Sequence, residues 1–183
     1  RSLSRTPAAA SLFALESQIL IDTEPETRNS FRDHRDTFII ADDVTLEAVT
    51  ESYSTLAIEG PKAAVAMMSQ SIPTPLDANS LTPWEFGLVA KVSATGATGW
   101  RFFVPSERFD ELFMRLVQSG IPAAAPADAL AVRLATGIPR YGADINADSI
   151  PHENRGVEEA NHPRQRCPPG PQLGSRARAR ATV

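Results

Sequence analysis

The chain has 183 residues, of which 42% are hydrophobic and 22% are charged, and its formal net charge at pH 7 is −4. This length and composition exclude a wholly disordered chain and predict one domain, or two small units, with a buried core. The charge is unevenly distributed, because residues 154–183 hold six Arg against two Glu and carry +4, whereas residues 1–153 carry −8. An acidic body disfavours non-specific binding of nucleic acids, whose phosphates are attracted to basic surfaces.

No apolar run approaches the roughly 20 residues of a membrane-spanning helix, so the sequence predicts no membrane segment. The single cysteine, Cys167, excludes an intramolecular disulfide and CxxC chemistry. It favours a reducing compartment, and we expect the cytoplasm. The acid-free opening at residues 1–15 contains an apolar run that is short for a targeting peptide. Because the chain does not begin with Met, we expect a fragment or a processed product.

Residues 12–83 are predicted to form a first, partial α+β unit, after a divergent segment at residues 1–11. The pattern predicts strands at 17–21, 38–41, 44–49 and 53–58 and helices at 25–36 and 62–69. Thr23 and Glu26 have the spacing of a capping box, which predicts that the first helix begins there. The turn-rich residues 69–83 contain three prolines and are predicted to connect this unit to a second one.

Residues 84–153 are predicted to form that second α+β unit. The pattern predicts strands at 85–93 and 99–104 and helices at 107–119 and 128–136. Ser106 is expected to cap the start of the first of these helices, and Gly120 is expected to end it. The second helix places Leu130 and Leu134 on one face.

The loop at residues 136–153, TGIPRYGADINADSIPHE, is long and follows neither a helical nor a strand period. Loops that only connect elements are usually shorter, so this segment is predicted to be functional. Residues 154–183 have few aliphatic side chains and an alternating Arg-Ala run, and we expect them to be disordered. This basic segment is either a solvated tail or an RNA-binding arm. An out-of-frame translation product would have the same composition.

Five segments, in order, resemble the folate-binding family that groups the glycine-cleavage T protein, an aminomethyltransferase, with the YgfZ-type proteins. They are ILIDTEPE, FIIADDVTLEAVT, LAIEGPKAA, TGATGWRFFVP and LATGIPRYGADINADSIPHE, and the similarity extends over residues 14–153. The resemblance implies two ferredoxin-like α+β units and a C-terminal β-barrel, arranged as a three-leaf ring around a central folate channel. We therefore expect an α+β fold with two ferredoxin-like antiparallel sheet units and covering helices. We expect it to be incomplete, without the family's N-terminal strands and barrel.

The resemblance also implies that tetrahydrofolate is the ligand and that the loop at 136–153 helps to wall its channel. The helix before this loop carries Arg133. Its planar guanidinium either binds a folate carboxylate or pairs with a local acid, Asp128 or Asp144.

Three further residues are candidates for the folate site. Tyr141 either stacks on or hydrogen-bonds the pteridine, or it is an amphipathic core residue. Glu153 either faces the ligand or accepts backbone amides, and Trp100 either lines the channel or belongs to the core. The sequence identifies no catalytic residue.

The sequence departs from two motifs of the family. In T proteins, a Gly-Glu-x-Gly-Tyr/Phe loop holds the pterin with its glutamate. The resemblance places Ala97 at that position, which disfavours aminomethyl transfer. YgfZ-type proteins carry a Lys-Gly-Cys-Tyr-x-Gly-Gln-Glu motif, of which Cys167 is either a counterpart or a free thiol in the tail. No metal site is predicted, because His152, Glu153 and His162 fit no HExxH or CxxC spacing.

The main functional hypothesis is a non-catalytic tetrahydrofolate-binding protein of YgfZ type that supports iron–sulfur cluster maintenance and tRNA modification. One alternative is an aminomethyltransferase that acts with the lipoyl-bearing H protein, which would make the chain an enzyme. The other is a truncated remnant that has no ligand or binds RNA through its tail. The expected partners are folate and proteins of iron–sulfur assembly or tRNA modification. We expect no membrane, and nucleic acid only through residues 154–183.

Overall fold

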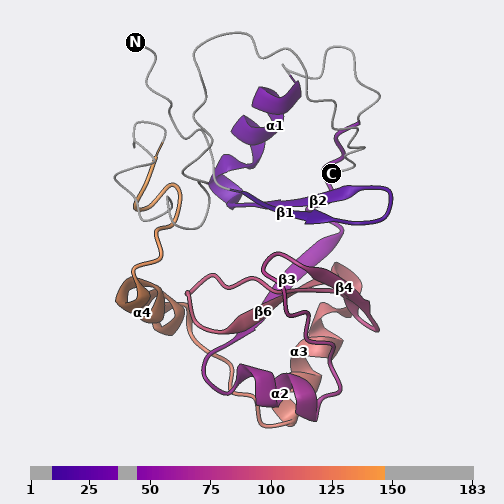
Figure 1. Ribbon diagram of the computed structural model, residues 1–183, viewed down its shortest axis with the longest axis vertical. Helices are drawn as coiled ribbons and strands as arrows, with labels where there is room; N and C mark the ends of the chain where they lie inside the picture. Colours follow the sequence, from indigo (N-terminus) through magenta and orange to yellow (C-terminus); the bar gives the residue numbers. More distant parts are fainter. Residues whose placement is uncertain (1–9, 37–44, 147–183) are drawn as a thin grey trace.

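The computed structural model describes residues 10–36 and 45–146, and it confirms the predicted α+β class (Figure 1). Two antiparallel sheets are built from the strands β1 (Ala10–Ala14), β2 (Ile19–Thr23), β3 (Tyr53–Glu59), β4 (Leu81–Trp84), β5 (Gly87–Ala90) and β6 (Gly99–Pro105). The helices are α1 (Arg28–Asp36), α2 (Ala63–Ser69), α3 (Phe109–Gln118) and α4 (Pro126–Thr136), and the 3-10 turns η1 (Pro25–Thr27) and η2 (Ser106–Arg108) precede α1 and α3. No helix in these described ranges is long and apolar enough to cross a membrane.

The larger sheet has the strand order β3-β6-β5-β4, and every neighbouring pair is antiparallel. Side chains alternate between the two faces of a strand. In β6, Trp100, Phe102 and Val104 therefore belong to the main core, whereas Phe103 belongs to a second core on the opposite face. Helices α2 and α3 cover the first face (Figure 1), where Leu112 of α3 is completely buried. Burying one such side chain stabilises a fold by roughly 1.5 to 3 kcal/mol.

The hairpin of β1 and β2 packs on the opposite face of this sheet, with α1 beyond it (Figure 1). Phe13 of β1 is completely buried, and its ring meets Phe103 edge-on with the ring centroids 5.5 Å apart. Asp22 of β2 forms an ion pair with Arg101 of β6. These contacts hold β2 against the sheet, and with it the acidic segment that follows, residues 24–26.

The predicted strand at 53–58 and the predicted helices at 62–69, 107–119 and 128–136 are confirmed, with ends that differ by a few residues. The strand predicted at 17–21 lies at Ile19–Thr23, and its partner β1 has no counterpart among the predicted strands. Of the strand predicted at 44–49, the described residues form only an isolated bridge at Thr45, so that prediction is wrong. The strand predicted at 38–41 lies outside the described residues.

The larger sheet crosses the predicted division between residues 83 and 84. That division falls within β4. Strand β3, from the predicted first unit, pairs with β6 of the predicted second unit, from Tyr53 opposite Pro105 to Glu59 opposite Gly99. The proline-containing segment at 69–83 therefore leads from α2 to β4, which belongs to the same sheet as β3.

Two predicted helix caps are replaced by other contacts. Residues 25–27 form a 3-10 turn that begins without a side-chain cap, and the carboxylate of Glu26 accepts hydrogen bonds from Arg140 instead. The hydroxyl of Ser106 accepts a hydrogen bond from Ser54 at 3.2 Å and makes no cap. The predicted helix end at Gly120 is confirmed, because this residue has the left-handed φ of 87° that ends many helices.

Candidate functional site

The segment after α4 folds back on itself through backbone hydrogen bonds. Gly137, with a φ of 74°, ends the helix, and the amide of Ile138 donates to the carbonyl of Arg133 at 3.2 Å. Further along, the amide of Gly142 donates to the carbonyl of Ile145 at 2.7 Å. The residues from 138 to 145 therefore form a compact loop of defined shape.

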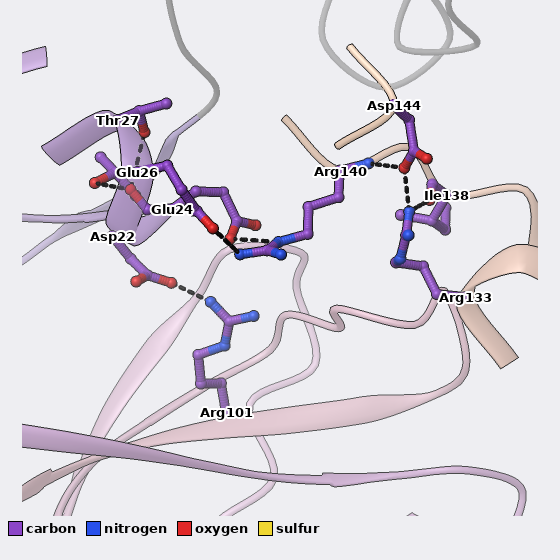
Figure 2. Close-up of polar contacts among 10 residues, drawn as sticks. Asp22, Glu24, Glu26, Thr27, Arg101, Arg133, Ile138, Arg140 and Asp144 are labelled. Carbon is purple, nitrogen blue, oxygen red and sulfur yellow. Dashed lines mark hydrogen bonds and ion pairs between the residues drawn. The ribbon is translucent and has the colours of Figure 1, made fainter. Parts of the chain in front are cut away.

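Arg133 points from α4 into this loop (Figure 2). Its Nη1 atom donates to the Ile138 carbonyl at 2.9 Å and to Oδ2 of Asp144. The side chain of Arg133 is only 12% exposed. Asp144, and not Asp128, is thus its acidic partner, since the carboxylate of Asp128 accepts the amide of Ala125 at the start of α4.

The carboxylate of Asp144 is held by two donors. Its Oδ2 atom accepts the backbone amide of Arg140 at 2.8 Å and the guanidinium of Arg133. The hydrogen bond from the Arg140 amide, and after it the one from Arg133, holds the pKa of Asp144 below its usual range. Asp144 is therefore ionised at neutral pH.

Arg140 connects the loop to the segment after β2. Its Nε atom donates to Glu24 at 2.9 Å, and its Nη2 atom donates to both carboxylate oxygens of Glu26 at 3.0 and 3.1 Å (Figure 2). The hydrogen bond and charge of Glu24 raise the pKa of Arg140 further above its ordinary value. Beside this cluster lies the ion pair of Asp22 and Arg101, in which burial, together with the nearby charge of Glu24, raises the pKa of Asp22 despite the opposing effect of the arginine.

Glu59, the last residue of β3, holds the turn between β5 and β6 at residues 93–98 through hydrogen bonds. The carboxylate of Glu59 accepts hydrogen bonds from the Ser93 hydroxyl at 2.8 Å and from the amides of Ala94 and Thr95 at 2.8 and 3.1 Å. The Thr95 hydroxyl donates to it as well. The carbonyl of Thr95 in turn accepts the hydroxyl of Thr136, so the end of α4 is docked on this turn.

Two clefts adjoin the turn at residues 93–98. The first has a volume of about 190 Å³, and its lining residues are Ala94, Thr95, Ala129, Leu130, Arg133 and Arg140. The second, of about 320 Å³, is lined by Leu76, Ala78, Lys91, Val92, Ser93, Gly96, Ala97, Thr98 and Gly99. The first cleft combines apolar walls from α4 with two arginine residues. That combination suits a ligand with an apolar body and an anionic end.

The structure places three of the four predicted folate-site residues, and their surroundings differ. Arg133 lines the first cleft, and Tyr141 is buried in the adjoining loop, where it forms a bridge with Ile145. Trp100 is buried in the main core, and its indole N–H donates to the carbonyl of Pro75 at 3.0 Å. It lines neither cleft. Glu153 lies outside the described residues.

Arg140 and the acids that bind it were not predicted from the sequence as parts of this site. Arg140 lies within the IPRYG part of the loop, and the acids that bind it lie in the segment IDTEPE. Both segments carried the family resemblance, but their pairing joins residues 116 positions apart. Across residues 10–36 and 45–146, no three His, Cys, Asp or Glu side chains are grouped as metal ligands.

No protein-family model matches the chain. Among curated proteins, the chain is 30% identical to the aminomethyltransferase of Chloroherpeton thalassium over 123 residues and 31% identical to that of Thermus thermophilus over 117 residues. These matches include 61% and 59% of this chain, but only 34% and 33% of the relatives. The chain thus spans about a third of the length of the curated relatives that it matches. These partial similarities support a distant relationship of the chain to the aminomethyltransferase, or T-protein, family.

Proposed function

We propose that this chain contributes a tetrahydrofolate site to an aminomethyltransferase of the T-protein type. The proposal rests on one observation above the others: Arg133 and Arg140 line a cleft beside the turn at residues 93–98. The similarity to aminomethyltransferases extends over about 60% of the chain. This support favours aminomethyl transfer over the YgfZ-type role as the leading function.

The chemistry of the first cleft fits the carboxylate end of folate. Folate carries a glutamate with two carboxylates, and a guanidinium offers a planar pair of donors to such a group. Arg133 is well buried and tied to the Ile138 carbonyl, so it is held in place before a ligand arrives. The side chains of Ala129 and Leu130 provide apolar wall for the neighbouring aromatic part.

The volume of the first cleft limits what it can hold. Sites for drug-sized ligands usually measure about 300 to 1,000 Å³, and the first cleft has only about 190 Å³. We therefore assign it the glutamate end alone. The second cleft, of about 320 Å³, adjoins the same turn and is a candidate for another part of the ligand.

Calorimetric titration with tetrahydrofolate tests this function. We expect the parent chain to bind, and we expect Arg133→Lys to weaken binding by about 1.5 to 3 kcal/mol, because lysine cannot reproduce the planar pair of donors. Arg115→Lys is the matched control, since Arg115 lies on α3 and lines neither cleft. Absence of binding to the parent chain would contradict the proposal, whereas equal binding by Arg133→Lys would leave Arg133 as a structural ion-pair partner only.

A second candidate function is the non-catalytic YgfZ-type role in iron–sulfur cluster maintenance and tRNA modification. The observation that favours it is Ala97 in the second cleft, at the position where the family resemblance places the pterin-binding glutamate. An alanine side chain offers no acceptor to a pterin. A glycine-cleavage assay with the lipoyl-bearing H protein separates the two: turnover supports the aminomethyltransferase, and folate binding without turnover supports the YgfZ-type protein.

A further inference from the structure

The cations of the first cleft are already matched by acids of the same chain. Arg140 is bound by Glu24 and Glu26, and Arg133 is bound by Asp144 (Figure 2). An anionic ligand that enters this cleft therefore meets no free positive charge. To reach a guanidinium, its carboxylate has to compete with an internal carboxylate.

In the contact between Arg133 and Asp144, the acid is more exposed than the arginine. Arg133 projects from a helix, is 12% exposed, and is also held by the Ile138 carbonyl. Asp144 lies in the loop and is 37% exposed. The two donors to Asp144 share a single oxygen atom, Oδ2. Displacement would thus move the acid and leave the arginine in place.

We propose that Asp144 is an internal competitor, which occupies on Arg133 the position that the carboxylate of an anionic ligand takes, and which the ligand displaces. The inference rests on the proposed function for the identity of the ligand, tetrahydrofolate. Asp144 then sets the affinity of the cleft for carboxylates. Its displacement also removes the acceptor of the Arg140 amide, so ligand binding rearranges the loop at residues 138–145.

The test compares Asp144→Asn with the parent chain. Asparagine has the same shape and still offers an oxygen to Arg133 and to the Arg140 amide, but it carries no charge. Glu111→Gln is the matched control, because it removes the same charge from the ion pair that Glu111 of α3 forms with Arg108, and neither residue lines either cleft. Two probes are titrated by calorimetry: tetrahydrofolate, and p-aminobenzoylglutamate, which has the two carboxylates but no pterin.

Asp144→Asn is expected to bind both probes roughly threefold to tenfold more tightly, since the competing ion pair is of the partly exposed kind. Glu111→Gln is expected to bind them as the parent does. Should Asp144→Asn fail to unfold cooperatively, Asp144→Ser is the second variant, and the same gain in affinity is expected of it.

The outcomes separate this inference from the proposed function. Tetrahydrofolate binding that is equally tight in the parent and in Asp144→Asn overturns the inference and leaves the function standing. If neither protein binds tetrahydrofolate but the variant gains affinity for p-aminobenzoylglutamate, the function fails and the inference stands. If no protein binds either probe, or if Glu111→Gln gains as much affinity as Asp144→Asn, the inference is overturned.

Discussion

Gly96 is the residue at which the turn between β5 and β6 meets the end of α4. It has a φ of 78°, in the left-handed region. A Cβ atom added there would lie 2.6 Å from Cγ1 of Ile138 and 3.0 Å from Oγ1 of Thr136. Neither of these atoms is the free end of a long side chain. Gly96→Ala therefore has to push α4 and the following loop away from the turn.

The cost has two parts. A non-glycine residue in the left-handed region costs roughly 1 to 2 kcal/mol, and overpacking of a tight contact costs about 1 to 3 kcal/mol. We expect Gly96→Ala to lower the free energy of unfolding by about 2 to 5 kcal/mol. That is a large share of the roughly 5 to 15 kcal/mol that stabilises a typical domain. Urea unfolding followed by tryptophan fluorescence measures the loss.

Gly120→Ala is the control for this prediction. Gly120 also has a left-handed φ, 87°, but no atom lies within 4 Å of the position of an added Cβ. It therefore carries the backbone strain without the clash, and its loss is expected to be about 1 to 2 kcal/mol. The gain from a stiffer unfolded chain is the same in both variants and cancels in the comparison. Equal losses in the two variants would refute the docking of α4 on the turn.

Three further predictions follow from the packing and the charges. Phe13→Ala is expected to cost about 3 to 5 kcal/mol of unfolding free energy, because Phe13 is completely buried; a urea titration in which it costs no more than a surface substitution would contradict the hairpin packing. Glu59→Ala is expected to speed hydrogen exchange of the amides at residues 94 and 95, because both donate hydrogen bonds to the Glu59 carboxylate. Unchanged exchange would show that Glu59 does not hold this turn. Asp144 and Asp22 are expected to change the free energy of unfolding with pH in opposite directions. The lowered pKa of Asp144 gives stability that is present above about pH 4 and lost as the pH falls through the folded-state pKa. The raised pKa of Asp22 gives stability that is present below about pH 4 and lost as the pH rises through the folded-state pKa. In acid titrations of unfolding, Asp144→Asn and Asp22→Asn should each remove one of these slopes, and a change of the same sign in both would contradict the assignment.

The elements that the sequence predicted well are those with a strong local signal. The apolar and aromatic residues of β6 and the helical spacing of α3 appear in a few neighbouring residues, and Gly120 marks a helix end by its own conformation. Strand pairing has no such local signal. The contact of β3 with β6 joins Ala57 to Arg101, and prolines at 69–83 have the same composition whether they join two units or two parts of one sheet.

The candidate site shows the same limit. Arg133 was identified through the family resemblance, as the arginine on the helix before the loop at residues 136–153, and the acid Asp144 was one of the partners considered. Glu26 was assigned to a helix cap, because its spacing from Thr23 fits one, yet its carboxylate binds Arg140 far along the chain. A tertiary ion pair replaced a local hydrogen bond there. The spacing of residues cannot reveal such a replacement.

A crystal structure of the chain with tetrahydrofolate tests the central claim most directly. We expect a folate carboxylate bound to the guanidinium of Arg133 in the cleft beside Thr95, with Asp144 displaced from it. A ligand bound elsewhere, with the contact between Arg133 and Asp144 intact, would contradict the proposed folate site.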